Sequence, residues 1–214
     1  MRSGSRGGRT FADEARRRQI VSCAIELIAE VGYPQASLAK IAERAGIAKS
    51  VVLYHFRGKD DLVAAIVEAV FATSVAVMIP RIVAAESATE RLHAYIASNG
   101  EFLDAHRRDA IALYEISVGY RDGAGRRFDQ VVQASVERSG VPAEFALLDP
   151  QNILADGIRD GEFVTTADPA VLKNILRAAL DGAVAELARD ETYNVLDHTS
   201  TLAELIISAI GAAR

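Results

Sequence analysis

Apolar residues recur every three or four positions along most of the 214-residue chain, the spacing that places them on one face of an α-helix. The fold class that this pattern predicts is all-α. Asp168 followed by Pro169 is typical of a helix start, and Pro80 is expected to end a helix that begins near residue 59. The expected helices cover 20–31, two short segments within 37–56, then 59–79, 84–104, 108–119, 125–139, 149–160, 169–187 and 198–212.

Residues 37–62 have the pattern of two short helices joined by a tight turn. Ser37 can cap the first helix through its hydroxyl, and Gly46 supplies the backbone freedom that a sharp turn needs. This combination indicates a helix-turn-helix that reads DNA. The side chains expected at the base edges are small or polar, namely Ala48, Lys49, Ser50, Val51, Tyr54 and His55.

The run 51–56 is also β-branched and aromatic, which is compatible with a buried strand. No second strand-like run with hairpin residues lies near it, so a strand here would have unpaired backbone groups. The helical interpretation is therefore preferred.

The order of these features resembles the N-terminal domain of the TetR (tetracycline repressor) family of bacterial regulators. An amphipathic helix over 20–31 ends in Gly32-Tyr33, the helix-turn-helix follows, and Phe56 leads into the segment 58–62, Gly-Lys-Asp-Asp-Leu. The resemblance covers about residues 14–74. It implies a three-helix DNA-binding domain joined to a larger, variable helical domain that binds a small effector and dimerises.

The resemblance also assigns roles to individual residues. Ala48 stands where the family often has Ser or Thr, and the family often has Gly or Thr near Ser50 and Val51. The operator sequence is therefore left open, whereas the mode of binding is implied. By resemblance, Ser37 and Lys59 contact phosphate, Lys49, Ser50, Val51, Tyr54 and His55 face the operator, and Phe56 packs inside.

Charge divides the chain into a basic N-terminal part and an acidic remainder. Residues 1–62 hold eleven Lys and Arg against seven Asp and Glu, a net charge of +4, while the whole chain carries −5. Residues 63–214 therefore carry −9. This distribution favours a protein that binds phosphate at one end only.

The expected organisation has two folded domains. A linking helix over 59–79 connects them, because its first turn can hold a phosphate while its far end lies in the second domain. The parts are a flexible basic arm over 1–13, a helix-turn-helix domain over 14–62, and a helical effector-binding and dimerisation domain over 63–214.

The first residues are rich in Gly and carry Arg2, Arg6 and Arg9. Two interpretations have equal weight, an arm that adds contacts to the DNA backbone or minor groove, and a solvated tail. No long apolar stretch follows these arginines, so neither a signal peptide nor a membrane span is expected there. The protein is predicted to be cytoplasmic, without a membrane partner.

The last two expected helices carry apolar stripes wider than one core contact needs. By resemblance they form a four-helix interface in a homodimer, and the alternative is burial inside one subunit. A two-fold dimer presents two recognition helices to major grooves about 34 Å apart and reads a palindrome. The expected interface residues are Leu172, Ile175, Leu176, Ala179, Gly182, Ala183, Leu202, Leu205, Ile206 and Ala209.

An effector domain needs a mostly apolar cavity with a few polar groups that orient the ligand. A ligand that better fits the conformation with misplaced recognition helices shifts the population away from DNA. The lack of clustered positive charge disfavours a highly anionic effector. Candidate lining residues are Phe71, Met78, Tyr95, Asn99, Phe102, His106, Tyr114 and Phe128.

No catalytic site, metal site or cofactor is expected. Cys23 lies beside an apolar helix stripe, which indicates a buried structural thiol, and the four histidines lack His-x-x-x-His spacing. The glycines of the loop 121–125 lack the third glycine of a nucleotide fingerprint. Asp156, Asp160 and Glu162 are interpreted as a solvated acidic face.

Two hypotheses for the function follow. The first is a ligand-responsive regulator, a repressor that releases a palindromic operator in double-stranded DNA when a small molecule binds. The second is an all-helical small-molecule-binding or enzymatic protein whose helix-turn-helix is vestigial. Only the first predicts that loss of the Lys49 or Tyr54 side chain weakens operator binding.

Overall fold

The N-terminal domain consists of three helices packed around Ile20, Ile41, Val52 and Phe56, all at most 1% exposed. The computed structural model describes residues 11–140 and 146–211, so Arg2, Arg6 and Arg9 of the expected arm lie outside the described residues. The elements are α1 (Phe11–Val31), the 3-10 turn η1 (Tyr33–Gln35), α2 (Leu38–Arg44) and α3 (Lys49–His55).

Two local details of the helix-turn-helix follow the sequence. The amide of Lys40 donates to Ser37 Oγ at 3.3 Å, so Ser37 caps α2. Gly46 adopts φ +65°, the left-handed region that the turn into α3 requires. The run 51–56 is helical up to His55, and only Phe56 is extended, which excludes the strand interpretation.

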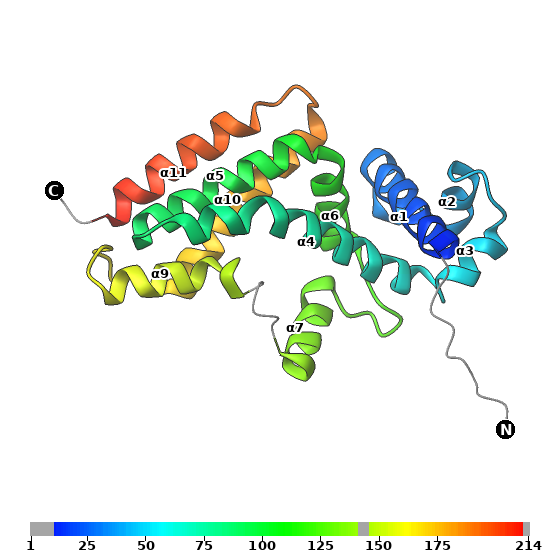
Figure 1. Cartoon of the computed structure of the whole chain (residues 1–214), viewed down its shortest axis with the longest axis horizontal. Coiled ribbons are helices and arrows are strands. Elements are labelled where there is room, and N and C mark those ends of the chain that lie inside the picture. Colours follow the sequence, from blue (N-terminus) through cyan, green and yellow to red (C-terminus); the bar gives the residue numbers. More distant parts are fainter. Residues whose placement is uncertain (1–10, 141–145, 212–214) are drawn as a thin grey trace.

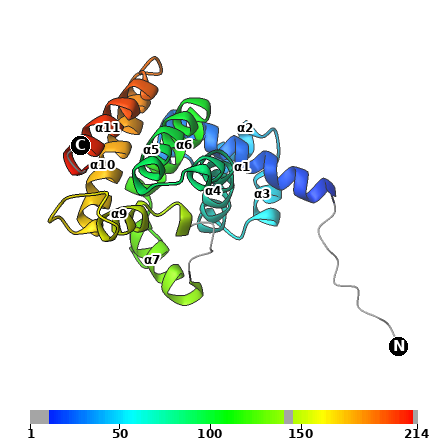
Figure 2. The same ribbon diagram turned by 60° about the vertical axis from the view of Figure 1, so that its left-hand side comes forward.

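A second, larger domain follows, and the chain as a whole is all-α, as predicted (Figure 1). α4 crosses from the first domain into the second, and α5 packs between α4 and α11. Figure 2 shows α10 and α11 as an outer layer on the side away from α1 to α3. The helices are α4 (Lys59–Ala84), α5 (Ala88–Ala105), α6 (Arg107–Gly119), α7 (Phe128–Ser139), α9 (Pro150–Arg159), α10 (Pro169–Arg189) and α11 (Val195–Ile210).

Several boundaries differ from the expected ones. α1 begins at Phe11, so residues 11–13 are helical and not part of an arm. The expectation that Pro80 ends its helix was wrong, because α4 continues to Ala84. Pro80 and Ala76 both lie on the exposed side of α4, so the carbonyl that loses its helical partner can be hydrated.

The two domains share a hydrophobic core. A single cluster joins α1 to α3 with the first half of α4, with α6 and with the end of α10, whereas a second cluster fills the space among α4, α5, α9, α10 and α11. The expected division at residue 62 therefore lies inside α4 and does not separate two hydrophobic cores. The contact between α1 and α6 holds the N-terminal domain against the second domain.

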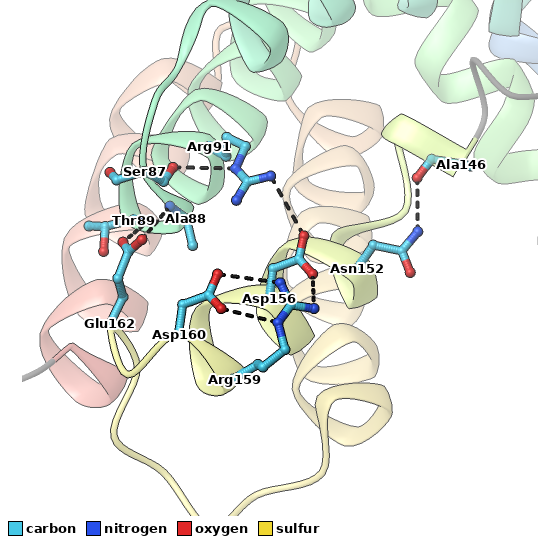
Figure 3. A network of polar contacts seen from close by, with 10 residues as sticks. All are labelled: Ser87, Ala88, Thr89, Arg91, Ala146, Asn152, Asp156, Arg159, Asp160 and Glu162. Atoms are coloured by element: carbon cyan, nitrogen blue, oxygen red, sulfur yellow. Dashed lines mark hydrogen bonds and ion pairs between the residues drawn. The ribbon is translucent and has the colours of Figure 1, made fainter.

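α5 approaches two neighbouring segments closely. A Cβ on Gly100 would lie 2.1 Å from Thr199 Oγ1, so this glycine is what allows α11 to lie against α5. At the other end of α5, Glu162 accepts hydrogen bonds from the amides of Ala88 and Thr89, each at 2.9 Å (Figure 3). Both contacts fix the position of α5 relative to the neighbouring segments of the second domain.

Charged residues of α9 complete the attachment of that helix (Figure 3). Asp156 lies 3.6 Å from Arg91 on α5 and 2.8 Å from Arg159, which also contacts Asp160 at 3.1 Å. The acidic residues near 160 are thus ion-paired or act as a helix cap. This agrees with a structural role on the protein surface.

α4 is long and apolar enough, by length and composition alone, to cross a membrane. About a third of that apolar window is buried inside the chain, where α4 contributes to both hydrophobic cores. Packing in the two cores accounts for the buried part of this window.

Candidate DNA-binding surface and effector cavity

α3 exposes most of the side chains that were expected to read DNA. Lys49, Ser50 and Tyr54 are exposed, with Tyr54 at 76%, while Val51 and His55 are half-buried. Val52 faces the core and holds the helix against α2. Ala48 and Ser37, at the starts of α3 and α2, are also exposed, so the expected residues form one accessible surface apart from Lys59.

Two further side chains belong to this surface and were missed. Leu53 is 46% exposed, although the preceding residue, Val52, is buried in the core. Arg57 follows α3 in an exposed position. Leu53 offers an apolar contact of the kind that thymine methyl groups accept, and Arg57 offers a phosphate contact. Their place next to Tyr54 was visible in the sequence, but only the helix geometry shows which side they face.

A side chain of α1 contacts the C-terminal end of α3. Arg17 Nη1 donates to the carbonyl of His55 at 3.0 Å, and its guanidinium lies 4.2 Å from the centre of the Phe56 ring. Phe56 is 1% exposed, as the resemblance implied. Arg17 therefore holds the end of α3 against α1.

Lys59 makes two contacts with Tyr33. Its ammonium donates to the carbonyl of Tyr33 at 2.8 Å and lies 3.9 Å from the centre of the Tyr33 ring. Burial lowers the pKa of Lys59, and the nearby charge of Asp60 offsets part of that effect. The side chain thus joins α4 to η1, and its expected phosphate contact stays a prediction.

Tyr33 also connects the first domain to α6. Its amide donates to Glu115 Oε2 at 3.4 Å, and its ring lies 5.9 Å from that of Tyr120. A Cβ on Gly119 would lie 3.3 Å from the Tyr33 ring, so α6 approaches this ring closely. Burial, with the charge of Asp60, raises the pKa of Tyr33 to about 12, so the phenol is neutral. We call Tyr33, Lys59, Glu115 and Tyr120 the Tyr33 joint.

The second domain contains a cavity of about 210 Å³. Side chains from α4, α5, α6 and α10 line it, together with Phe128 of α7 and Leu148 before α9. The expected residues found in its lining are Phe71, Met78, Tyr95, Asn99, Phe102, Tyr114 and Phe128.

His106 does not line the cavity. α5 ends at Ala105, so His106 lies beyond the helix whose face borders the cavity. Its ring stacks on that of Phe102, with the centroids 5.4 Å apart, and its Nδ1 lies 3.4 Å from Asp109. The expectation that His106 lines the cavity was wrong, because it assumed that α5 continues through residue 106, whereas the helix ends at Ala105.

α10 supplies lining residues that the sequence did not indicate. Leu180 and Val184 are buried beside the cavity, and Arg177 and Asp181 lie on the same side but are exposed to solvent. Arg177 Nη1 donates to the Tyr95 hydroxyl at 3.4 Å. Partial burial at the cavity edge raises the pKa of Asp181, while Arg177 acts in the opposite direction. The cavity is thus mostly apolar inside, and Arg177 and Asp181 lie at its edge without forming an ion pair.

The outer surface of α10 and α11 is apolar or small. Ile175 is 53% exposed and Leu205 is 64% exposed, and Gly182 and Ala209 are also exposed. Val171, at 52%, extends this surface by one turn of α10 and was not among the expected residues. Leu172, Ala179, Leu202 and Ile206 are partly buried at its border.

Two residues expected at this surface lie elsewhere. Leu176 is 1% exposed and Ala183 is fully buried in the core of the same chain. The apolar stripe of α10 is wide because it has two sides, one towards the core and one outward. The sequence pattern could not separate these two sides.

Two other expectations concerned reactive side chains. Cys23 is half-buried on α1 and therefore more accessible than expected, and burial raises the pKa of its thiol. A raised pKa makes the thiol less reactive. Within residues 11–140 and 146–211, no group of three or more His, Cys, Asp and Glu side chains could hold a metal ion.

Comparisons with known proteins agree with this arrangement. Residues 20–66 match the family described as "Bacterial regulatory proteins, tetR family". The chain is 24% identical to the fatty acid metabolism regulator protein of Bacillus subtilis (strain 168), over 90% of this chain and 94% of that protein. It is 34% identical over 86 residues to the regulator BetI of Escherichia coli, over 39% of this chain and 44% of that one.

Solved structures share the fold. The regulator FadR from Bacillus subtilis, solved in complex with stearoyl-CoA, superimposes with a TM-score of 0.70 at 23% identity, over 90% of this chain and 98% of that one. SmeT in its complex with triclosan superimposes with a TM-score of 0.66 at 19% identity, over 92% of each chain. With the capped helix-turn-helix and the exposed face of α3, these findings identify residues 20–66 as the DNA-binding domain of the tetR family of bacterial regulatory proteins, and the rest of the described chain shares the fold of FadR and SmeT.

Proposed function

We propose that the protein is a dimeric transcriptional repressor that binds a palindromic operator and releases it when a small molecule occupies the cavity. The observation that carries this proposal is the arrangement of α6. One side of this helix lines the cavity through Leu113 and Tyr114, and the neighbouring Glu115 contacts Tyr33 of the DNA-binding domain. A ligand that moves α6 therefore acts on the segment between α1 and α2 of the DNA-binding domain.

The path from α6 to α3 is short. Tyr33 lies between α1 and α2, and Lys59 ties it to the first turn of α4. The end of α1 and the start of α4 flank the helix-turn-helix, so a shift at Tyr33 changes the orientation of α3 relative to the second domain. Binding at the cavity and binding of DNA are then linked, and each weakens the other by the same factor.

We propose the outer surface of α10 and α11 as the dimer interface. Support comes from its exposed apolar side chains, Val171 and Ile175 on α10 and Leu205 on α11, and from the exposed small residues Gly182 and Ala209. Exposed apolar patches on soluble proteins mark interaction surfaces, and a two-fold contact buries both copies of such a patch. Two recognition helices on one dimer would meet two half-sites.

The nature of the cavity supports an apolar effector. Its lining is dominated by Phe, Tyr, Leu, Val and Met side chains. The Bacillus subtilis FadR was solved with stearoyl-CoA and SmeT with triclosan, two ligands with large apolar parts. We propose that this protein likewise recognises a small molecule with an apolar body.

We further propose that the protein works in the cytoplasm, by binding and not by catalysis, without a cofactor or a membrane partner. The relatives are transcriptional regulators, and operator DNA lies in the bacterial cytoplasm. The contribution of α4 to both hydrophobic cores supports the absence of a membrane partner.

Selection from random duplex DNA, with the bound fraction sequenced at two salt concentrations, tests the function. We expect an enriched palindrome with an affinity that falls as salt rises. Lys49→Ala and Tyr54→Ala should each weaken binding to that palindrome about tenfold or more. Arg159→Ala, which removes an exposed arginine from α9, is the matched control and should leave the affinity unchanged.

An absence of enrichment, or unchanged affinity in both α3 variants, would overturn the proposal. The alternative, a small-molecule-binding or enzymatic protein with a vestigial helix-turn-helix, would then be preferred. Dimer formation and the circular dichroism spectrum should be the same in wild type and variants, so that a loss of DNA binding reports on α3.

A further inference from the structure

We propose that the cavity accepts an amphipathic ligand with a single acidic group, which Arg177 holds at the cavity edge while the apolar part lies inside. This inference rests on the proposed role of the cavity as the effector site. It assigns a chemical class to that effector and an anchor on α10.

Arg177 is suited to bind an anion. Its guanidinium carries five N–H donors, and the structure shows one of its nitrogens donating to the Tyr95 hydroxyl at 3.4 Å. Among the described residues, Arg177 forms no ion pair with any carboxylate, since none lies within 4.0 Å. Donors therefore remain for a ligand, and a guanidinium binds a carboxylate through two parallel hydrogen bonds.

The difference in exposure between the edge and the interior of the cavity predicts how the ligand is oriented. Arg177 and Asp181 are exposed at the cavity edge, whereas Leu180, Val184 and Tyr95 are at most 6% exposed. A ligand with its acidic group at Arg177 would keep that group hydrated and place its apolar part against buried side chains. An uncharged apolar ligand would leave the guanidinium without this additional partner.

Asp181 limits the charge that the site can take. It lies one helical turn after Arg177 and also lines the cavity, so a ligand with several negative charges would be repelled. A ligand with one negative charge matches the one cation of the lining, because Arg177 is its only Lys or Arg among the described residues. The volume, about 210 Å³, is below the range of about 300–1,000 Å³ for drug-sized ligands and favours a compact ligand.

Calorimetric titration of the full-length protein with decanoate and with decanol tests this inference. The two probes share a ten-carbon chain and differ in the acidic group. Wild-type protein should bind decanoate more tightly than decanol. Arg177→Gln should weaken decanoate binding about ten- to 100-fold, with little effect on decanol, because a charge-assisted hydrogen bond is lost.

Three variants sharpen the test. Arg177→Lys keeps the positive charge and should retain part of the affinity for decanoate. Asp181→Asn should strengthen decanoate binding, since it removes the opposing carboxylate. Arg189→Gln is the matched control, because it removes an exposed arginine from the end of the same helix, where it pairs with Glu186 outside the cavity.

Equal decanoate affinities in folded wild type and Arg177→Gln would overturn the inference, as would no decanoate binding or tighter binding of decanol. These titrations contain no DNA, so they are independent of the proposed function. Arg177-dependent decanoate binding without any operator binding would contradict the repressor function and leave the ligand class intact. Operator binding without decanoate binding would contradict only the ligand class.

Discussion

The DNA-binding surface and the cavity are assembled in opposite ways. The side chains that we propose to face DNA come from the seven-residue helix α3 and the residues beside it, so a short stretch of sequence defines them. The cavity takes its lining from segments between Val70 and Val184, on helices that meet only in the folded chain. A local surface can be identified from sequence spacing, whereas a cavity depends on how distant helices pack.

The largest expected effect tests how far the local surface depends on its small core. Phe56→Ala removes a fully buried ring beneath α3 and should lower the free energy of unfolding by about 3–5 kcal/mol. Phe11→Ala, which truncates a ring that is 81% exposed, is the control and should have little effect. Urea unfolding followed by circular dichroism measures both, and a similar small change in both variants would contradict the packing of Phe56.

The next effect concerns the outer surface of α10 and α11. Ile175→Arg combined with Leu205→Arg places unpaired charges in the proposed interface and should weaken the dimer at least about 100-fold. Sedimentation velocity over a concentration series measures this change. Val83→Arg, at a 62% exposed position on α4, should leave the dimer intact. If the double variant dimerises like wild type, the interface lies elsewhere.

The smallest effect concerns the Tyr33 joint, where the two regions meet. Glu115→Gln weakens the hydrogen bond that the Tyr33 amide donates and should speed hydrogen exchange at that amide by about five- to tenfold, equivalent to about 1 kcal/mol. NMR exchange rates measure it. Glu101→Gln, which breaks the surface pair with Arg81, is the control. Equal exchange rates would show that Glu115 does not hold the joint.

The predictions for Ser37 and Gly46, which depended on nearby residues, were confirmed, and those for Pro80 and His106, which depended on the surroundings in the fold, differed from the structure. The cap at Ser37 and the turn at Gly46 depend on neighbours within a few residues, and both are present. Pro80 was misjudged because the cost of proline inside a helix depends on whether the freed carbonyl reaches solvent. His106 was misjudged because α5 ends one residue before it.

The wide apolar stripe of α10 shows what the sequence pattern does not predict, namely which side of the helix is buried. The same stripe contains Leu176, buried in the core, and Ile175, exposed on the outer surface. The next residue, Arg177, lines the cavity, which is a third environment on the same helix. Helical periodicity gives the angle of each side chain around the axis but not the identity of the neighbour at that angle.

The sequence by itself determined the all-α fold, the helix-turn-helix and most of its exposed face, because caps, turns and helical periodicity are set by residues a few positions apart. Only the tertiary structure decided that Lys59 lies on Tyr33 and that α6 connects this tyrosine to the cavity. It also decided that Arg177 lines the cavity. These placements depend on contacts between residues far apart in the chain, and the free energy of such contacts comes from packing that no local pattern records.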